Sequence, residues 1–359
     1  MHTPSQLELL SRIGFCARRW PDLVIPDDSI LARIVEQHRS GYVIHDGSDT
    51  HVAKSLPRLR HRVEQASERP CVGDWCIAAV RHGGEWIIEE LLPRFSTLVR
   101  GAAGETQARQ AIAANIDHAL IVTGMDRDFN LRRIERYLTL VSSSDAHPIL
   151  VLTKADKSSE VDELRVAVET IAPGTTVHAV NAKSPESCAA LAAELLPGQT
   201  AVLIGSSGAG KSTLTNTLLG AELQATGTTR ERDGRGRHTT VSRALKPLPG
   251  GACLIDTPGL REIKLTGDED LAEAGFDDIE ALAASCRFRD CKHEKEPGCA
   301  VRAAIEAQEL DPARLSSWSK LGGEISRAGE SPIARRERKQ HEAAMARALR
   351  DVLKKKGRS

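Results

Sequence analysis

The chain is built around the segment Val202-Leu-Ile-Gly-Ser-Ser-Gly-Ala-Gly-Lys-Ser-Thr213. Its apolar start, from Ala201 to Ile204, predicts a buried strand that ends at Gly205. The residues that follow fit the pattern G-x-x-x-x-G-K-S, in which glycines let the backbone curl and point its N–H groups at a diphosphate. Thr213 to Leu219 predicts a helix whose positive N-terminal end faces the phosphates. The alternative is a chance turn rich in glycine and serine, and it does not explain the order of strand, loop and helix.

Two side chains of this loop have expected roles in chemistry. Lys211 can reach the β- and γ-phosphates and take part in catalysis, and Ser212 can offer its hydroxyl to Mg²⁺. We therefore expect a nucleoside triphosphate site that includes Gly205, Ser206, Ser207, Gly208, Ala209, Gly210, Lys211, Ser212 and Thr213.

Length and composition predict a globular protein of two or three domains. The chain has 359 residues, of which 40% are hydrophobic and 27% charged, as is ordinary for soluble proteins. It has no apolar run long enough for a membrane span, and its N-terminus resembles no secretory leader. Its eight cysteines, three of them clustered near the end, favour a metal site in a reducing compartment over a disulfide scaffold. We therefore expect a cytoplasmic protein without a membrane partner.

The region from Ile30 to Arg94 has short apolar segments separated by turn signals, which predicts a small barrel. A five-stranded barrel of this size is compatible with an OB-fold, a common oligonucleotide-binding scaffold. Because only 3% of the chain is aromatic, we expect such a barrel to read the RNA backbone and shape rather than to stack bases. The expected strands are Leu31–Val35, Gly41–His45, His51–Ala53, Trp75–Val80 and Glu85–Glu89.

Other residues of this region allow two interpretations each. A basic segment would either contact phosphates or form a solvated loop. Two cysteines of the region, Cys71 and Cys76, are interpreted as small core residues rather than as metal ligands. The basic segment contains Arg58, Arg60, His61 and Arg62.

From His118 onward the pattern changes to alternating strands and helices, which predicts a mainly parallel sheet. Because such sheets bind ligands at the carboxyl ends of their strands, polar residues directly after each strand are candidates for the site. The expected strands are His118–Thr123, Pro148–Leu152 and Thr176–Val180, and the expected helices are Asn130–Val141, Glu160–Ile171 and Ala189–Leu196.

Thr153-Lys-Ala-Asp156 follows one of these strands and resembles the guanine-recognition motif of GTPases, which is usually Asn-Lys-x-Asp. The Asp156 carboxylate can accept hydrogen bonds from the adjacent N1–H and N2–H₂ of guanine, a pair that adenine does not offer. Lys154 would lay its stem over the ring, while Thr153 replaces the usual asparagine by a hydroxyl. Elsewhere such a tetrapeptide is more often a surface turn. The expected guanine contacts are Thr153, Lys154, Ala155 and Asp156, with Ala182 and Lys183 from a Ser-Ala-Lys-like loop.

Two further segments follow the phosphate-binding loop. Gly227 to Thr240 is polar and rich in glycine, so we expect the nucleotide to order it. Either Thr239 or Thr240 could ligate Mg²⁺ through its hydroxyl. Asp256 ends a strand and could hold Mg²⁺ through water, and the Gly259 N–H could bond the γ-phosphate. Loss of that phosphate would release both segments, which makes an order–disorder switch.

The order of these motifs is unusual. In ordinary GTPases the phosphate-binding loop precedes the base-recognition motif, whereas here Asp156 precedes Gly205 by about fifty residues. The chain is therefore expected to be a circular permutation of the α/β P-loop GTPase fold. The switch strand that ends at Asp256 then lies directly before the C-terminal region.

The C-terminal region combines a cysteine cluster and a basic tail. Three thiols and one imidazole fall within fourteen residues, which matches a closed tetrahedral structural zinc site, although unlinked reduced cysteines are the alternative. From Ser331 to Ser359 there are ten Lys/Arg and three Asp/Glu. This tail, with its Arg335–Lys356 helix, would contact a polyanion or be a solvated helix. The expected zinc ligands are Cys286, Cys291, His293 and Cys299.

Barrel, permuted GTPase motifs and Cys/Cys/His/Cys module, in that order, resemble the ribosome small-subunit-dependent GTPase A family (RsgA, also called YjeQ). The resemblance implies a GTPase that acts late in small-subunit assembly, binds ribosomal RNA and is stimulated by the subunit. It implies that the protein binds GTP and GDP with Mg²⁺ and holds one structural Zn²⁺. The expected partners are the small ribosomal subunit, its rRNA and other assembly factors, and the chain is expected to be a monomer.

The family resemblance also bears on catalysis. Leu260 stands where many GTPases have a glutamine that orients water, and a leucine cannot do so. The resemblance implies that His238, in a Gly-x-His-Thr-Thr segment, orients or deprotonates water instead. Its alternative role is that of a polar loop residue.

We therefore expect three domains, namely an N-terminal arm with a barrel (1–104), a permuted GTPase domain (105–266) and a helical zinc-binding domain with a basic tail (267–359). The alternatives are a metabolic P-loop enzyme, against which Asp156 argues, and a zinc-dependent nucleic-acid-binding protein whose nucleotide site is only structural.

Overall fold

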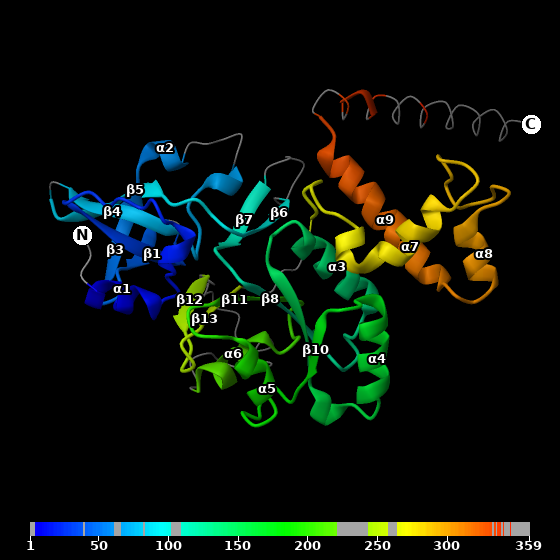
Figure 1. Cartoon of the computed structure of the whole chain (residues 1–359), viewed down its shortest axis with the longest axis horizontal. Helices are drawn as coiled ribbons and strands as arrows, with labels where there is room; N and C mark the ends of the chain where they lie inside the picture. Colours follow the sequence, from blue (N-terminus) through cyan, green and yellow to red (C-terminus); the bar gives the residue numbers. More distant parts are fainter. Residues whose placement is uncertain are drawn as a thin grey trace, which may run out of the picture.

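The chain forms three regions that lie one after another along the long axis of the molecule (Figure 1). The structure is a computed structural model that describes residues 4–38, 40–60, 66–81, 83–101, 109–220, 243–257, 264–331, 334, 336–338, 340 and 345. A barrel lies at the N-terminal end, an α/β sheet in the middle and a group of helices at the other end (Figure 1). Among the helices in these ranges, none is both long and apolar enough to cross a membrane.

The N-terminal region is a five-stranded barrel, as the sequence predicts. The strands pair in the order β1-β2-β3-β5-β4, and β4 pairs back with β1, which closes the barrel. Alternate side chains of the strands fill its interior, Cys76 among them, and Cys71 is buried as well. The strands are β1 (Ser29–Gln37), β2 (Tyr42–His45), β3 (Thr50–Ser55), β4 (Trp75–Arg81) and β5 (Glu85–Leu91), with the short helices α2 (Pro57–Arg60) and η2 (Ala66–Glu68) between β3 and β4.

A short N-terminal arm packs against the outside of the barrel. It consists of the helix α1 (Pro4–Ser11), followed by the short 3₁₀ helix η1 (Ala17–Arg19). The chain turns at Gly14, which has a positive φ of 90°, and a Cβ there would come within 2.4 Å of the Arg33 guanidinium. Phe15 and Trp20 then pack on Trp75 of β4, so aromatic packing holds the arm.

A buried arginine joins the arm, the barrel and the central region. Arg33 of β1 has no exposed surface. Its guanidinium donates to the carbonyl oxygens of Ile13, Gly73 and Asn115, at 2.5, 3.2 and 3.1 Å. Because a buried charge is stable only when it is hydrogen-bonded, these three carbonyls fix where the barrel lies relative to the central sheet.

The central region is a sheet of six strands, and it is mainly parallel, as the sequence predicts. Its strands follow the order β10-β9-β8-β11-β13-β12, and only β12 runs antiparallel to its neighbour. β12 also meets β1 of the barrel through the pair Glu36 and Ala244. The strands are β8 (His118–Gly124), β9 (His147–Thr153), β10 (Thr176–Ala179), β11 (Thr200–Gly205), β12 (Ala244–Pro247) and β13 (Cys253–Asp256).

Helices cover both faces of this sheet. Residues of β8, β9, β11 and β13 alternate between two apolar clusters, so these four strands are apolar on both sides, as buried parallel strands require. Helices α3 (Leu131–Ser142) and α4 (Val161–Ile171) cover one face. Helices α5 (Ala189–Glu194) and α6 (Lys211–Leu219) cover the other.

A hairpin that the sequence analysis did not predict connects the barrel to the sheet. It consists of β6 (Thr97–Gly101) and β7 (Arg109–Ala114), which pair antiparallel across the expected domain boundary after residue 104.

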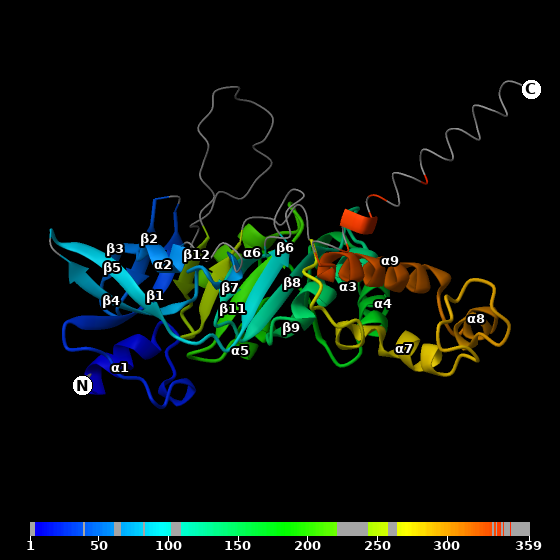
Figure 2. The ribbon, with the colours of Figure 1, turned by 90° about the horizontal axis from the view of Figure 1, so that it is seen from above.

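The C-terminal region packs on α3. It contains a π-helical turn η4 (Ala272–Phe276), α7 (Asp277–Ala284), α8 (Ala300–Glu306) and α9 (Pro312–Gly329). Phe276 and Leu321 belong to the same apolar cluster as Ile134 and Leu138 of α3, so the two regions share one core. Figure 2 shows α9 lying next to α3, at the side of the sheet away from the barrel.

Candidate nucleotide and zinc sites

The carboxyl ends of the parallel strands bring the predicted nucleotide-binding segments together at one edge of the sheet. β11 ends at Gly205, β9 at Thr153 and β13 at Asp256, and β11 lies between β8 and β13. The strands therefore place the phosphate-binding loop beside Asp256, and β9 lies one strand further on.

The glycines of the phosphate-binding loop stand where no other residue fits well. Gly205 has a φ of 147°, and a Cβ there would lie 2.3 Å from the carbonyl oxygen of Val122. Gly210 has a φ of 97°, and its Cβ would lie 3.0 Å from the Thr153 hydroxyl. The loop thus curls against β8 and β9 because glycine leaves room for their backbone and side chains.

Lys211 lies inside this loop. Only 7% of its surface is exposed, and its ammonium donates to the carbonyl oxygens of Gly205 and Ser206, at 2.8 and 2.6 Å. Burial lowers the pKa of Lys211 to about 8, although the carboxylates of Asp256 and Asp128 act in the opposite direction. The ammonium is therefore held at the centre of the loop, where the phosphates of a nucleotide would meet it.

The base-recognition segment is bonded to the phosphate-binding loop. Thr153 is fully buried, and its hydroxyl donates to the carbonyl oxygen of Ala209. Lys154 has a left-handed φ of 62° and pairs with Asp126. Asp156 is exposed on the turn η3 (Ala155–Lys157), where its carboxylate is available to a base.

The remaining predicted nucleotide contacts lie in the loop after β10, in the first turn of α6, or outside the described residues. In the loop after β10, Ala182 accepts a hydrogen bond of 2.6 Å from Thr217 of α6, and the Lys183 N–H donates to the Asn181 side chain at 3.0 Å, so this loop lies against α6. Ser212 and Thr213 lie in the first turn of α6. His238, Thr239, Thr240 and Gly259 lie outside the described residues.

Sequence reasoning missed two side chains at this edge. Asp126 and Asp128 follow β8 and contact Lys154 and Ser206. The available signal was their position, because they are carboxylates directly after a predicted parallel strand.

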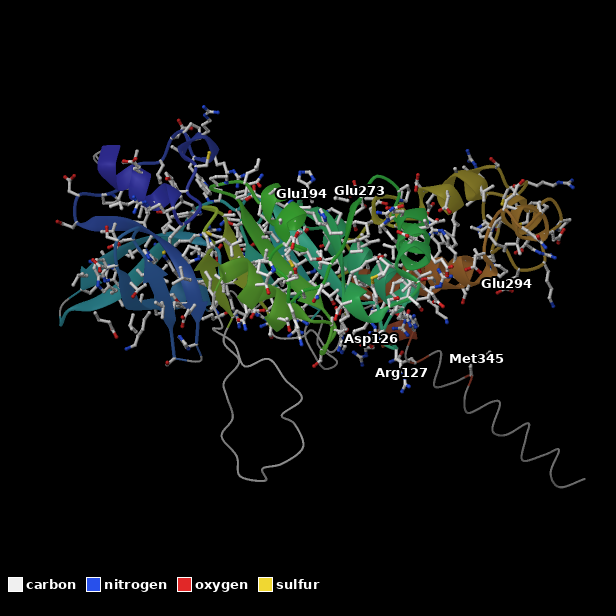
Figure 3. All side chains as sticks on the ribbon, turned by 90° about the horizontal axis from the view of Figure 1, so that it is seen from below. Asp126, Arg127, Glu194, Glu273, Glu294 and Met345 are labelled. Carbon is white, nitrogen blue, oxygen red and sulfur yellow. The ribbon has the colours of Figure 1, made fainter. Side chains whose placement is uncertain are left out.

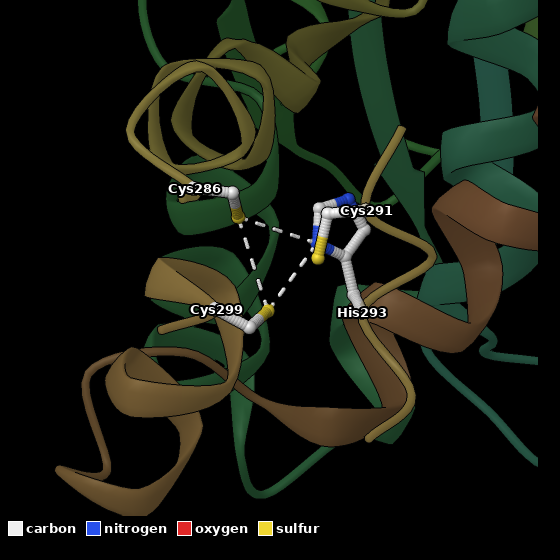
Figure 4. Close-up of side chains that lie close together, drawn as sticks. All are labelled: Cys286, Cys291, His293 and Cys299. Atoms are coloured by element: carbon white, nitrogen blue, oxygen red, sulfur yellow. Dashed lines mark hydrogen bonds between the residues drawn. The ribbon is translucent and has the colours of Figure 1, made fainter. Parts of the chain in front are cut away.

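The four predicted zinc ligands converge in the C-terminal region (Figure 4). Their donor atoms all lie within 4.8 Å of one another. The Sγ atom of Cys286 is 3.6 Å from the Nδ1 atom of His293 and 3.9 Å from the Sγ atom of Cys299, which is 3.4 Å from the same Nδ1. Cys291 is the fourth member of the group.

These distances fit a tetrahedral zinc ion. With Zn–S near 2.3 Å and Zn–N near 2.0–2.1 Å, a tetrahedron has S–S edges of roughly 3.8 Å and S–N edges of roughly 3.6 Å. Two elements hold the ligands in place. The Sγ atom of Cys299 caps α8 by accepting a hydrogen bond from the Arg302 N–H at 3.4 Å. The His293 ring packs edge-on against Trp318 of α9, with 5.6 Å between the ring centroids.

Comparisons with known proteins agree with this geometry. The sequence model described as RsgA GTPase matches residues 91–266. A protein of Xanthomonas campestris pv. campestris (strain B100), named "Small ribosomal subunit biogenesis GTPase RsgA", is 56% identical over 309 residues, which are 86% of this chain and 84% of that protein. The chain belongs to the RsgA GTPase family.

Other relatives agree with this assignment. A protein of the same name from Xanthomonas axonopodis pv. citri (strain 306) is 56% identical over 330 residues, or 88% of this chain and 90% of that protein. Among solved structures, YjeQ from Thermotoga maritima matches with a TM-score of 0.59 and 23% identity, over 84% of this chain and 100% of that one. YloQ, described as a circularly permuted GTPase, matches with a TM-score of 0.57 and 22% identity, over 85% of this chain and 98% of that one. These two structures confirm the permuted fold.

Membership of the RsgA GTPase family makes this chain a GTPase, with GTP as substrate, GDP as product and Mg²⁺ as its metal. The expectation of a permuted GTPase with an N-terminal barrel is confirmed.

Proposed function

We propose that this chain couples GTP hydrolysis to late maturation of the small ribosomal subunit, binds rRNA and leaves the subunit after hydrolysis. One observation carries the proposal. Relatives named as small-subunit biogenesis GTPases are 56% identical to this chain over 84% to 90% of their own length. The Cys/Cys/His/Cys cluster lies in the C-terminal region, apart from the nucleotide edge. It supports a function that involves more than nucleotide binding.

In this proposal the nucleotide edge of the sheet holds GTP. Asp156 accepts from the guanine edge and Lys154 covers the ring, while the loop from Gly205 to Thr213 surrounds the phosphates. The glycine-rich loop, in which Lys211 is buried, and the exposed Asp156 support this arrangement. The further contacts are Ala155, Ala182, Lys183 and Gly259.

Catalysis would depend on charge stabilisation more than on covalent chemistry. Lys211 stabilises the charge that develops on the phosphates, and its place at the centre of the loop supports this role. His238 orients or deprotonates the attacking water. Ser212, Asp256 and either Thr239 or Thr240 would hold Mg²⁺, which neutralises phosphate charge when bound.

The flanking regions would supply the ribosome contacts. We propose that residues 1–104 bind rRNA through the barrel, that residues 105–266 form the GTPase domain, and that residues 267–359 form a domain held by one structural Zn²⁺, with a basic tail. All four zinc positions would be filled by Cys286, Cys291, His293 and Cys299, so that this metal has a structural role. The chain would act as a cytoplasmic monomer that meets other assembly factors on the subunit.

Co-sedimentation with purified small ribosomal subunits tests the switch. Wild-type chain and Lys211→Ala would be compared with GDP, with GTP and with a GTP analogue that resists hydrolysis. We expect the analogue to hold the wild-type chain on the subunit and GDP to release it, while binding of Lys211→Ala does not respond to nucleotide. Identical binding of both proteins under all conditions would contradict the switch.

A further inference from the structure

One loop at the nucleotide edge has no part in the motifs described so far. It joins β8 to α3, from Gly124 to Asn130, and begins at the carboxyl end of a parallel strand. It contains two carboxylates, Asp126 and Asp128. Figure 3, in which Asp126 and Arg127 are labelled, shows the loop at the surface of the central region.

The first carboxylate contacts the base-recognition segment. The ammonium of Lys154 lies 2.6 Å from the Oδ2 atom of Asp126. The pair is partly covered, with 24% of the lysine side chain and 37% of the aspartate side chain exposed. The hydrogen bond from Lys154 is the largest cause of a lowered pKa at Asp126. Asp126 therefore fixes the direction in which Lys154, in its left-handed backbone conformation, extends its stem.

The second carboxylate contacts the phosphate-binding loop. The hydroxyl of Ser206 donates to the Oδ2 atom of Asp128 at 2.6 Å. The other oxygen, Oδ1, accepts from the guanidinium of Arg133, also at 2.6 Å. The positive charge of Arg133 balances the negative charge of Asp128. The carboxylate can therefore lie beside the phosphate-binding loop and accept the hydrogen bond from Ser206.

Backbone contacts hold the loop itself in place. The Met125 N–H donates to the Thr153 carbonyl oxygen at 2.8 Å. The Asn130 side chain caps α3 by accepting from the Arg133 N–H at 3.0 Å. The loop is thus anchored to β9 at one end and to a helix at the other, so its two carboxylates have a defined geometry.

We propose that Asp126 and Asp128 are positioning residues of the GTP site, Asp126 acting through Lys154 and Asp128 acting through Ser206. This inference rests on the proposed nucleotide-binding role of Lys154 and of the phosphate-binding loop. It makes the loop Gly124–Asn130 a third wall of the site, beside the base-recognition segment and the phosphate-binding loop. Neither carboxylate is proposed to touch the reacting atoms.

A double-mutant cycle on the full-length chain tests the Asp126 pair. Affinities for fluorescent GTP and GDP are measured for wild type, Asp126→Asn, Lys154→Met and the double variant. Lys154→Met keeps the stem and removes the ammonium. We expect Asp126→Asn to raise the Kd for GTP and GDP by the same factor, about three- to tenfold, since both nucleotides carry the same base. In the Lys154→Met background the same change should have no further effect.

The Asp128 pair is tested in the same way with Asp128→Asn, Ser206→Ala and their combination. Asp128→Asn should raise both Kd values, and Ser206→Ala should remove this effect. Asp162→Asn is the matched control, because Asp162 is an exposed aspartate in the first turn of α4 and should leave both affinities unchanged. Thermal unfolding of each variant shows whether the fold is intact.

The outcomes separate this inference from the proposed function. Non-additive effects within each pair support positioning through the named partner. Additive effects within the pairs would overturn the positioning role alone. The same conclusion would follow if Asp126→Asn and Asp128→Asn bound GTP and GDP as tightly as the Asp162→Asn control. A wild-type chain that binds no GTP would overturn the proposed site together with this inference.

Discussion

Thr153 donates its hydroxyl hydrogen to the carbonyl oxygen of Ala209, so the base-recognition segment and the phosphate-binding loop are joined by a direct hydrogen bond. The residue stands where related GTPase motifs have asparagine, yet its hydroxyl makes a connection within the site. Both residues are fully buried. The substitution of threonine for asparagine therefore keeps the two halves of the nucleotide site in contact.

Replacing Thr153 by valine tests this connection. Thr153→Val keeps the shape but leaves the buried Ala209 carbonyl without this donor, so we expect the free energy of unfolding to fall by about 1–2 kcal/mol and the Kd for GTP to rise. Thr153→Ser keeps the hydroxyl and serves as the control. Denaturant unfolding and nucleotide titration measure both effects. A valine variant as stable and as tight-binding as wild type would contradict the connecting role.

The lowered pKa of Lys211 predicts that nucleotide binding takes up protons. With a pKa of about 8 in the free protein, about half of the lysine is neutral at pH 8. Bound phosphates favour the ammonium and raise its pKa, so binding at pH 8 should take up about half a proton, and binding at pH 7 much less. Calorimetry of Mg-GDP binding in buffers of different ionisation enthalpy measures the uptake. Equal apparent enthalpies in all buffers at pH 8 would count against it.

The same pKa predicts how stability depends on pH. An unfolded lysine has a pKa near 10.4, so the unfolded chain binds more protons than the folded chain between about pH 8 and pH 10.4. The contribution of Lys211 to the free energy of unfolding should therefore rise with pH in this window and be constant below it. Lys211→Met should remove this contribution. Denaturant unfolding of both proteins from pH 7 to pH 10 makes the comparison, and parallel curves would contradict the prediction.

Zinc content tests the cysteine cluster. Wild-type chain should contain one zinc ion, and Cys291→Ser should lose most of it, because one of four ligands is replaced. Cys16→Ser, a cysteine outside the cluster, should keep it. Metal analysis measures the stoichiometry, and thermal unfolding should show that the C-terminal region of Cys291→Ser melts at a lower temperature. Equal zinc content in the two variants would exclude Cys291 as a ligand.

A buried ion pair joins the C-terminal region to α3. Arg314 of α9 lies 3.2 Å from Glu135 of α3, which is fully buried, and 2.9 Å from Asp278 of α7. Arg314→Met should lower the free energy of unfolding by about 3 kcal/mol, because the buried Glu135 keeps its charge but loses one of its partners. The double variant Glu135→Leu/Arg314→Met should have a smaller decrease in the free energy of unfolding, because neither charge of the buried pair remains.

Denaturant unfolding measures these costs. Arg165→Ala, which breaks an exposed pair within α4, is the control and should cost no more than about 0.5 kcal/mol. A double variant less stable than Arg314→Met would show that the pair itself, rather than the burial of an unbalanced charge, holds the two regions together.

Much of the fold could be predicted because it depends on local patterns. Apolar runs predicted the strands of the barrel and those of the sheet except β12, and the spacing of Gly205, Gly210 and Lys211 predicted the phosphate-binding loop. The zinc cluster could be predicted since its ligands lie within fourteen residues of one another. In these cases neighbouring residues alone specify the structure.

The remaining features depend on residues that are distant in sequence. Arg33 bonds carbonyls 20 to 82 residues away, and Arg314 pairs with a glutamate 179 residues before it. Helix α9, which supplies Arg314, was not predicted because its apolar side chains are few and it contains Gly322 and Gly323. The roles of Asp126 and Asp128 likewise appear only once the strands place them beside Lys154 and Ser206.

We propose that the small ribosomal subunit stimulates GTP hydrolysis by this chain. The direct test is the rate of GTP hydrolysis by the purified full-length chain, alone and with purified small subunits, with large subunits, ATP and Lys211→Ala as controls. We expect a large stimulation by small subunits only, with GTP only, and none for Lys211→Ala. A chain that binds GTP but hydrolyses it at the same rate with and without small subunits would contradict it.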